Sequence, residues 1–303
     1  MDPEPQTPAT SNLVLVEQAI DRIADHLDQA KLSYGHGAID ARSEALWIIS
    51  KQLQISPSDA LDRLDTPLDP HRYEAALAVA NQRIQTRKPL AYILEEAWLM
   101  GVPFYCNEQS IVPRSWIAEL ITEGALEPWL PADGRALDLC TGNGSLAVLL
   151  ALSCPDIHVS ACDVSAPALA VAARNIDRHG LVSQIELFHG DLWSPLPDPT
   201  DDNRFDLIVC NPPYVNAASM RALPAEYQAE PAIALAGGED GMDLIRSIIA
   251  NAPDYLSERG ALVLEIGNEI EHFHRAFPQI PVIWMDVSAG NEQVLLIQAE
   301  DLR

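Results

Sequence analysis

The sequence predicts an α/β protein with a doubly wound, mostly parallel, seven-stranded sheet, preceded by a small helical domain and a connecting β-hairpin. From about residue 115, short apolar runs typical of strands alternate with helical stretches, as in parallel sheets with crossover helices on both faces. Before about residue 95, apolar residues recur at helical spacing. We therefore expect a helical domain over 1–95, a hairpin over 96–114 and an α/β domain over 115–303.

The helical domain is predicted from two periodic apolar sets between residues 12 and 87. Ser56 or Ser58 is a candidate N-cap for a further short helix. The first ten residues are acidic and rich in proline, and we expect them to be disordered. The apolar sets are Leu13, Val16, Ile20, Ile23 and Leu27, and then Ala45, Leu46, Ile49 and Leu53.

The predicted hairpin lies in "WLMGVPFYCNEQSIVPRS", residues 98–115, where two short β-like runs flank the turn-forming stretch "CNEQ". Seven strand candidates follow. The last two are joined only by "SAGN", which is too short for a parallel crossover, so an antiparallel strand is expected at the end of the sheet. The candidates are "RALDLC", "HVSACDV", "IELFHGD", "FDLIVCN", "GALVLEIG", "IPVIWMDV" and "EQVLLIQA".

Composition limits the classes of function. The 303 residues are 48% hydrophobic and 21% charged, which is ordinary for a globular protein, and the sequence shows no secretory signal or apolar stretch of membrane-spanning length. We therefore expect a cytoplasmic protein. No metal site is expected, because the five cysteines (Cys106, Cys140, Cys154, Cys162 and Cys210) lack paired spacing and His272 and His274 lack a third partner.

The formal net charge of -25 argues against stable nucleic-acid binding, which depends on lysine and arginine neutralising phosphates. Such a chain would attract basic partners, and ribosomal proteins are basic. Solubility alone is the competing explanation of the acidity.

Ligands of doubly wound sheets bind beyond the carboxyl ends of the strands, and here acidic or amide groups follow the strands. Gly142 and Gly144 open a helix, and Asp163 lies 19 residues after Gly144, a pattern that also fits a nicotinamide dehydrogenase. Asp138, four residues before Gly142, favours instead a ligand with a cationic ammonium group. S-adenosylmethionine has such a group as well as a ribose and an adenine, which would suit Asp138, Asp163 and Asp191 respectively.

Four stretches in order, "LDLCTGNGSLAVLLA", "CDVSAPALAVAARN", "GDLW" and "NPPY", resemble the class I S-adenosylmethionine-dependent methyltransferases, which have a Rossmann-like sheet. The helical start, the hairpin and "NPPYV" are similar to the HemK-like protein-glutamine methyltransferases. "LPAEYQAEPAIALAGGEDGMDLI" resembles the branch acting on ribosomal protein L-three of the large subunit. In "SIVPRSWIAELI", Arg114-Ser115 stands where the release-factor enzymes usually have Arg-Pro-Asp-Thr-Glu.

This resemblance implies S-adenosyl-L-methionine as cofactor and a glutamine side-chain nitrogen of a basic ribosomal protein as methyl acceptor, with the helical domain recognising the substrate. The implied cofactor-binding residues are Asp138, Thr141, Gly142, Asn143, Gly144, Asp163, Asp191, Leu192 and Asn211. Trp193 either lines the adenine pocket or packs in the core. Arg114 either takes part in function or has only the structural role of tying the hairpin to the α/β domain.

The implied catalytic residues are Asn211, Pro212, Pro213 and Tyr214. The Asn211 side-chain carbonyl and the Pro212 backbone carbonyl would accept the two N–H groups of the substrate amide. The two prolines would fix the direction of these acceptors, and Tyr214 would pack on the amide or the adenine. Release factors and adenine in DNA remain alternative substrates, a dehydrogenase is the alternative chemistry, and a ribosome-assembly factor without turnover is the non-enzymatic alternative.

Overall fold

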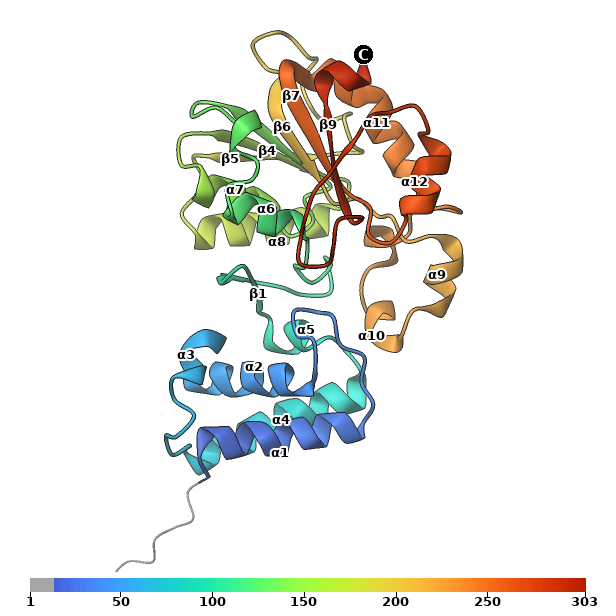
Figure 1. Ribbon diagram of the computed structural model, residues 1–303. Helices are drawn as coiled ribbons and strands as arrows, with labels where there is room; N and C mark the ends of the chain where they lie inside the picture. Colours follow the sequence, from blue (N-terminus) through green and yellow to red (C-terminus); the bar gives the residue numbers. More distant parts are fainter. Residues whose placement is uncertain (1–13) are drawn as a thin grey trace, which may run out of the picture. The chain divides into compact units, whose positions relative to one another are not determined.

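The chain forms two compact units that divide between Leu94 and Glu95, in a computed structural model that describes residues 14–303 (Figure 1). The expected disorder of the first ten residues lies outside this range, as does Leu13. Within residues 14–303, no helix combines the length and the apolar character needed to cross a membrane.

The second unit contains the predicted doubly wound sheet, with strand order β5-β4-β3-β6-β7-β9-β8. The first five of these strands run parallel, whereas β9 is antiparallel to both β7 and β8. The expected antiparallel strand is therefore present, but it lies between β7 and the short edge strand β8. The strands are β3 (Arg135–Leu139), β4 (His158–Asp163), β5 (Ile185–His189), β6 (Phe205–Cys210), β7 (Leu256–Glu265), β8 (Ile283–Trp284) and β9 (Val294–Gln298).

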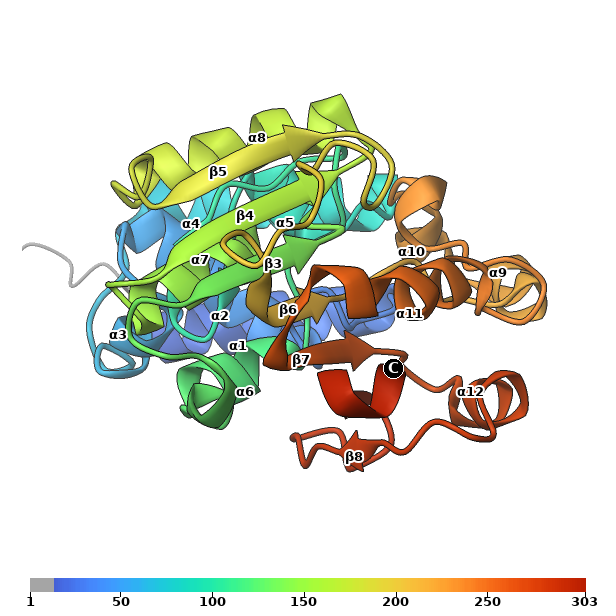
Figure 2. The same cartoon turned by 90° about the horizontal axis from the view of Figure 1, so that it is seen from above.

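Helices cover both faces of the sheet, as Figure 2 shows from above. Alternate strand residues pack to opposite sides: Leu207 and Val209 of β6 join one hydrophobic cluster, and Ile208 and Cys210 join the other. The first cluster includes α6 (Ile117–Thr122), α7 (Ser145–Ser153) and α8 (Ala166–Arg178), and the second includes α11 (Asp243–Tyr255) and α12 (Ile270–Ala276). Two short helices, α9 (Ala217–Ala222) and α10 (Ala225–Gln228), follow β6.

The predicted hairpin is present, but its turn was placed wrongly at "CNEQ". Strands β1 (Ala97–Leu99) and β2 (Val102–Phe104) pair antiparallel and are joined by Met100 and Gly101. Both turn residues have positive φ, +49° and +75°. A two-residue turn of this kind matches the twist of paired strands, and glycine adopts the second position without strain.

The first unit is helical, as expected, with α1 (Val16–Gln29), α2 (Ala41–Leu53), α3 (Pro57–Leu61), α4 (Pro70–Thr86) and α5 (Leu90–Leu94). The predicted apolar residues of α1 are buried. The cap of α3 is Ser56, whose hydroxyl accepts the backbone N–H of Asp59 at 3.0 Å.

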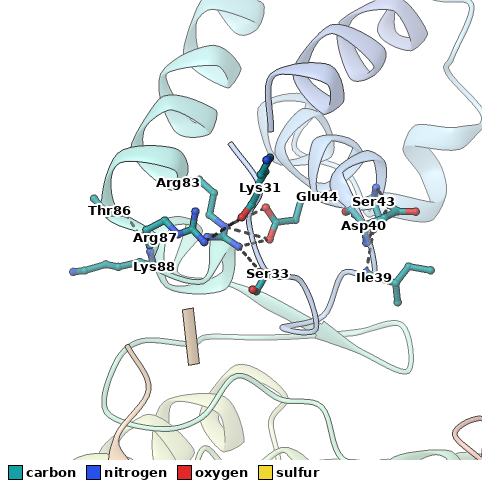
Figure 3. A network of polar contacts seen from close by, with 10 residues as sticks. All are labelled: Lys31, Ser33, Ile39, Asp40, Ser43, Glu44, Arg83, Thr86, Arg87 and Lys88. Carbon is teal, nitrogen blue, oxygen red and sulfur yellow. Dashed lines mark hydrogen bonds and ion pairs between the residues drawn. The ribbon is translucent and has the colours of Figure 1, made fainter. Parts of the chain in front are cut away.

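A buried ion pair joins α4 to α2 in this helical unit. Arg83 of α4 is fully buried and its Nε lies 3.1 Å from Glu44 Oε2, while its Nη2 donates to Glu44 Oε1 at 3.1 Å and to the Ser33 carbonyl at 3.0 Å. Figure 3 shows the two side chains directed toward each other between the helices. A charge at this depth requires its partner, since an unpaired buried ion loses its hydration without compensation.

We predict that Arg83→Met lowers the free energy of unfolding by about 3–5 kcal/mol, because Glu44 is left buried without its cation. Urea unfolding followed by circular dichroism measures the change. Arg72→Met on the exposed side of α4 is the matched control. Adding Glu44→Leu should recover a large part of the loss. A loss below about 1 kcal/mol, the range of a surface pair, would contradict the prediction.

Candidate functional site

A cavity of about 320 Å³ lies beyond the carboxyl ends of β3, β4 and β6. β4 lies on one side of β3 and β6 lies on the other, so the strand order reverses at β3. Ligands of such sheets bind at this point of reversal. The lining is largely apolar with a few polar groups. It comprises Gln109, Ser110, Ile111, Cys140, Gly142, Cys162, Asp163, Val164, Ser165, Ala168, Asp191, Leu192, Asn211, Pro213, Pro231, Ile233, Ala234 and Leu244.

The loop between β3 and α7 reaches the cavity through Gly142. Gly142 has φ of +56°, and a Cβ there would meet no atom within 4 Å, so its backbone faces open space. Gly144, with φ of +78°, is confined instead, since a Cβ would lie 3.0 Å from that of Ala172 in α8. The two glycines therefore have different roles. Gly144 lets α7 pack closely against α8, and Gly142 exposes its backbone to the cavity.

Asn143 of the same loop does not line the cavity. Its side chain is buried, with Nδ2 donating to the Ile111 carbonyl at 3.1 Å. Its own carbonyl accepts Nδ2 of Asn175 at 2.9 Å, and Asn175 Oδ1 accepts the backbone N–H of Tyr105 at 2.7 Å. Asn143 thus ties the loop to the segment before α6, and the sequence contained no signal for this role.

Asp138, in β3, is almost fully buried and is not among the residues that line the cavity. Its Oδ2 accepts the Thr141 hydroxyl at 2.5 Å and the Ala147 N–H at 3.0 Å, while its Oδ1 has no hydrogen-bond partner. Burial raises the pKa of Asp138 to about 7, against the lowering effect of those two donors. The unsatisfied oxygen fits a cationic donor, because a buried acceptor without a partner is costly.

Asp163, at the end of β4, lines the cavity and also shapes its floor. Its Oδ2 accepts the N–H of Gly142 at 2.8 Å, and its Oδ1 accepts the N–H of Ser165 at 2.8 Å. Burial raises the pKa of this carboxyl. A carboxylate has about four lone-pair sites, so two remain for a ligand's hydroxyl groups. Asp191 and Leu192 line the same cavity, as the sequence predicted.

The Asn-Pro-Pro-Tyr segment directly follows β6, and its four residues lie in different surroundings. Asn211 and Pro213 line the cavity, whereas Pro212 is buried and Tyr214 is not among the lining residues. The Tyr214 hydroxyl donates to Glu265 Oε1 at 3.2 Å. The structure therefore brings Asn211 and Pro213 together with Asp163, and turns the Tyr214 hydroxyl toward the interior.

Two cavity walls that the motifs did not identify are joined by an ion pair. Arg114 Nη2 lies 2.6 Å from Glu230 Oε2, and Glu230 Oε1 accepts the N–H of Val112 at 2.9 Å. Residues 109–111, together with Pro231, Ile233 and Ala234, adjoin this pair and line the cavity. Arg114 thus has the structural role considered above. Glu230 carried no sequence signal, since its partner is 116 residues away.

Trp193 packs in the core and does not wall the cavity. Its ring stacks on Tyr255 with centroids 4.6 Å apart, and its side chain belongs to the cluster beneath α11. His272 contacts Glu269 and His274 contacts Trp284. Among residues 14–303, no group of three or more His, Cys, Asp or Glu side chains is arranged to hold a metal ion.

Comparisons with known proteins show which family this chain resembles. Residues 122–226 match the family described as "Methyltransferase small domain". Two similar proteins are the "Ribosomal protein uL3 glutamine methyltransferase" of Burkholderia pseudomallei, 46% identical over 98% of this chain and 97% of its own length, and that of Bordetella pertussis, 47% identical over 95% of each.

Among solved structures, the hMettl16 catalytic domain in complex with MAT2A 3'UTR hairpin 6 is similar at a TM-score of 0.50 and 13% identity, covering 76% of this chain and 81% of its own. This likeness confirms the fold class alone.

We predict that Asp163→Ala weakens binding of S-adenosylhomocysteine by about 1.5–3 kcal/mol, because the cavity loses a charged acceptor and the Gly142 N–H loses its partner. Calorimetry measures the affinity. Asp156→Ala, an exposed carboxylate just before β4, is the matched control. Tighter binding of NAD than of S-adenosylhomocysteine by the unaltered protein would contradict this interpretation of the cavity.

Proposed function

Because this chain belongs to the family of the ribosomal protein uL3 glutamine methyltransferases, we propose that it transfers a methyl group from S-adenosylmethionine to the side-chain amide nitrogen of a glutamine in ribosomal protein uL3. The observation that carries the proposal is the placement of Asn211 and Pro213 in one cavity with Asp163. An amide-binding group and a carboxylate suited to a ribose thus share one space.

The residues present fit the cofactor. The unsatisfied, buried Oδ1 of Asp138 suits the ammonium group, and Asp163 retains two acceptor positions for the ribose hydroxyls. Apolar side chains of the lining, among them Val164 and Leu192, suit the flat adenine, with Asp191 at the same wall. Thr141 and Gly144 would act indirectly. Thr141 donates a hydrogen bond to Asp138, and Gly144 lets α7 and α8 pack closely. Asn143 would likewise act through the loop that it fixes.

In this reaction the protein orients the acceptor amide. S-adenosylmethionine supplies an electrophilic methyl group on a sulfonium centre. A glutamine nitrogen is a poor nucleophile because its lone pair is delocalised into the carbonyl. We propose that the Asn211 side-chain carbonyl and the Pro212 backbone carbonyl accept its two N–H groups and hold the lone pair toward the methyl group. Pro212 and Pro213 fix φ on both sides of that carbonyl.

Tyr214 contributes to this arrangement in a way that differs from the sequence hypothesis. With its hydroxyl on Glu265, Tyr214 is better placed to anchor the segment than to stack on the amide.

The charge of the whole chain favours a basic substrate. The chain has 44 acidic residues and 19 Lys or Arg residues. On the exposed face of α1, Glu17, Asp21 and Asp25 lie at four-residue spacing, and Asp21 pairs with Arg42. Such a surface accelerates encounter with a cationic protein and repels DNA. We propose that residues 1–95 recognise the substrate and that the reaction takes place in the cytoplasm, where ribosomal proteins are made.

The proposed function is tested by incubating the protein and isotope-labelled S-adenosylmethionine separately with unmethylated uL3, with release factors and with duplex DNA. Peptide mass spectrometry should find the label on a glutamine of uL3. Label only on a release-factor glutamine would identify the neighbouring branch. Label only on adenine would overturn the protein substrate, and no label on any of them would favour a non-enzymatic assembly role.

We predict that Asn211→Ala lowers kcat about a hundredfold or more while the affinity for S-adenosylhomocysteine stays nearly unchanged. The lost acceptor acts on the transition state, where one preorganised polar contact contributes on the order of 2.7–4 kcal/mol. Single-turnover kinetics and calorimetry separate the two effects. Asn211→Asp keeps an acceptor oxygen of the same shape and should be milder than alanine. Near-normal turnover of Asn211→Ala with bound cofactor would show that this side chain does not hold the amide.

A further inference from the structure

Glu265, at the end of β7, is a buried carboxyl group that two separate stretches of the chain contact. Its side chain is 1% exposed. Oε2 accepts the Ser115 hydroxyl at 2.6 Å and the N–H of Trp116 at 3.0 Å, and Oε1 accepts the Tyr214 hydroxyl at 3.2 Å. Ser115 and Tyr214 are 99 residues apart in the sequence, and this one carboxyl group joins them.

The first of these contacts is with Tyr214, whose side chain and backbone have little room to move. A Cβ on Gly267 would lie 2.5 Å from Tyr214 Cε2, one on Gly241 would lie 2.3 Å from the Tyr214 carbonyl oxygen, and one on Gly237 would lie 2.7 Å from its Cα. Two backbone segments, 237–241 and the turn at Gly267, therefore enclose Tyr214, and Glu265 fixes its hydroxyl end. Asn211 is only three residues away, so the position of Tyr214 constrains that of Asn211.

The second contact, with Ser115 and Trp116, lies next to another part of the cavity lining. Ser115 Oγ accepts the N–H of Ile117 at 3.2 Å, which closes the turn that Glu265 holds. One residue before, Arg114 pairs with Glu230, and residues 110 and 111 line the cavity. Through Ser115 and Trp116, Glu265 therefore anchors the start of this wall as well.

We propose that Glu265 is a positioning residue for methyl transfer, because its carboxylate holds Tyr214 and the turn at Ser115–Trp116 together and so fixes both Asn211 and the 110–111 wall of the same cavity. The inference rests on the proposed function. A carboxylate suits this position since all three partners are donors. A glutamine would keep one acceptor but turn a donor toward the others.

The protonation state of Glu265 gives this role a pH dependence. Burial raises the pKa of Glu265 to about 7, against the lowering effect of its donors. Tyr214 is the titratable group in contact with it, and Arg114 and Tyr227 act on Tyr214 in turn. The ionised form accepts all three hydrogen bonds. Protonation replaces an acceptor by a donor, so the arrangement is complete above about pH 7 and weakens as the pH falls through that value.

The structural half of the proposal is tested on the free protein, independently of activity. Hydrogen exchange of Glu265→Gln should be faster than that of the wild type in peptides spanning 112–117 and 211–216, and unchanged in peptides of β4. Glu258→Gln, an exposed residue of the same strand, is the matched control and should behave as wild type. Unchanged exchange in Glu265→Gln overturns the proposal.

The functional half is tested by kinetics on uL3. In the wild type, kcat should rise with pH to a plateau with a midpoint near 7, whereas Glu265→Gln should lack this rise and have a plateau roughly tenfold lower. KM for S-adenosylmethionine should stay the same. Tyr214→Phe, which removes one hydroxyl and keeps the ring, should lower kcat in the same way, and the double variant should lose no more than Glu265→Gln alone.

A Glu265→Gln variant with faster exchange but wild-type kcat and pH profile would overturn the positioning role. Additive losses in the double variant would overturn it too, as would a tenfold loss confined to KM for the cofactor. If Glu265→Gln fails to fold, Tyr214→Phe tests the role in its place, and a wild-type kcat for that variant counts against the proposal. Absence of methyl transfer by the wild type is a different result, which contradicts the proposed function before any variant is made.

Discussion

The α/β unit depends on buried carboxyl groups that accept hydrogen bonds from its loops. Asp138, Glu230 and Glu265 are buried and Asp163 is half-buried, and each accepts hydrogen bonds from backbone N–H groups of segments that follow or precede the strands. A buried carboxylate loses its hydration, so the fold must supply donors to it. Loops that could otherwise vary are thereby fixed, and the cavity keeps its shape through these contacts.

The four carboxyl groups differ in the hydrogen-bond donors that contact them, and this difference indicates different roles. Glu230 has a guanidinium, and Glu265 has three neutral donors that satisfy both oxygens. Asp138 keeps one oxygen without a partner and has a pKa raised to about 7. The first two therefore stabilise the protein's own walls, whereas Asp138 is completed best by a cationic ligand.

The sheet, the helical unit and those cavity residues that directly follow strands could be predicted because they rest on local patterns. The alternation of strands with helices identified the sheet, and Asn211 and Asp163 were found from their places after β6 and β4. The hairpin turn was missed because "CNEQ" has stronger turn composition than Met100-Gly101, although only the latter has the required backbone. The contacts of Glu230 and Glu265 could not be predicted, since their partners are more than 50 residues distant and only the folded sheet brings them together.

Proton release on cofactor binding tests most directly whether the unsatisfied Asp138 receives a cation. Calorimetric titration with S-adenosylhomocysteine near pH 7, repeated in buffers of different ionisation enthalpy, counts the protons exchanged. A cation beside Asp138 lowers its pKa from about 7, so wild-type protein should release a substantial fraction of a proton, and Asp138→Asn should release much less. Binding without proton release by the wild type, or with equal release by Asp138→Asn, would contradict this role of the buried carboxyl group.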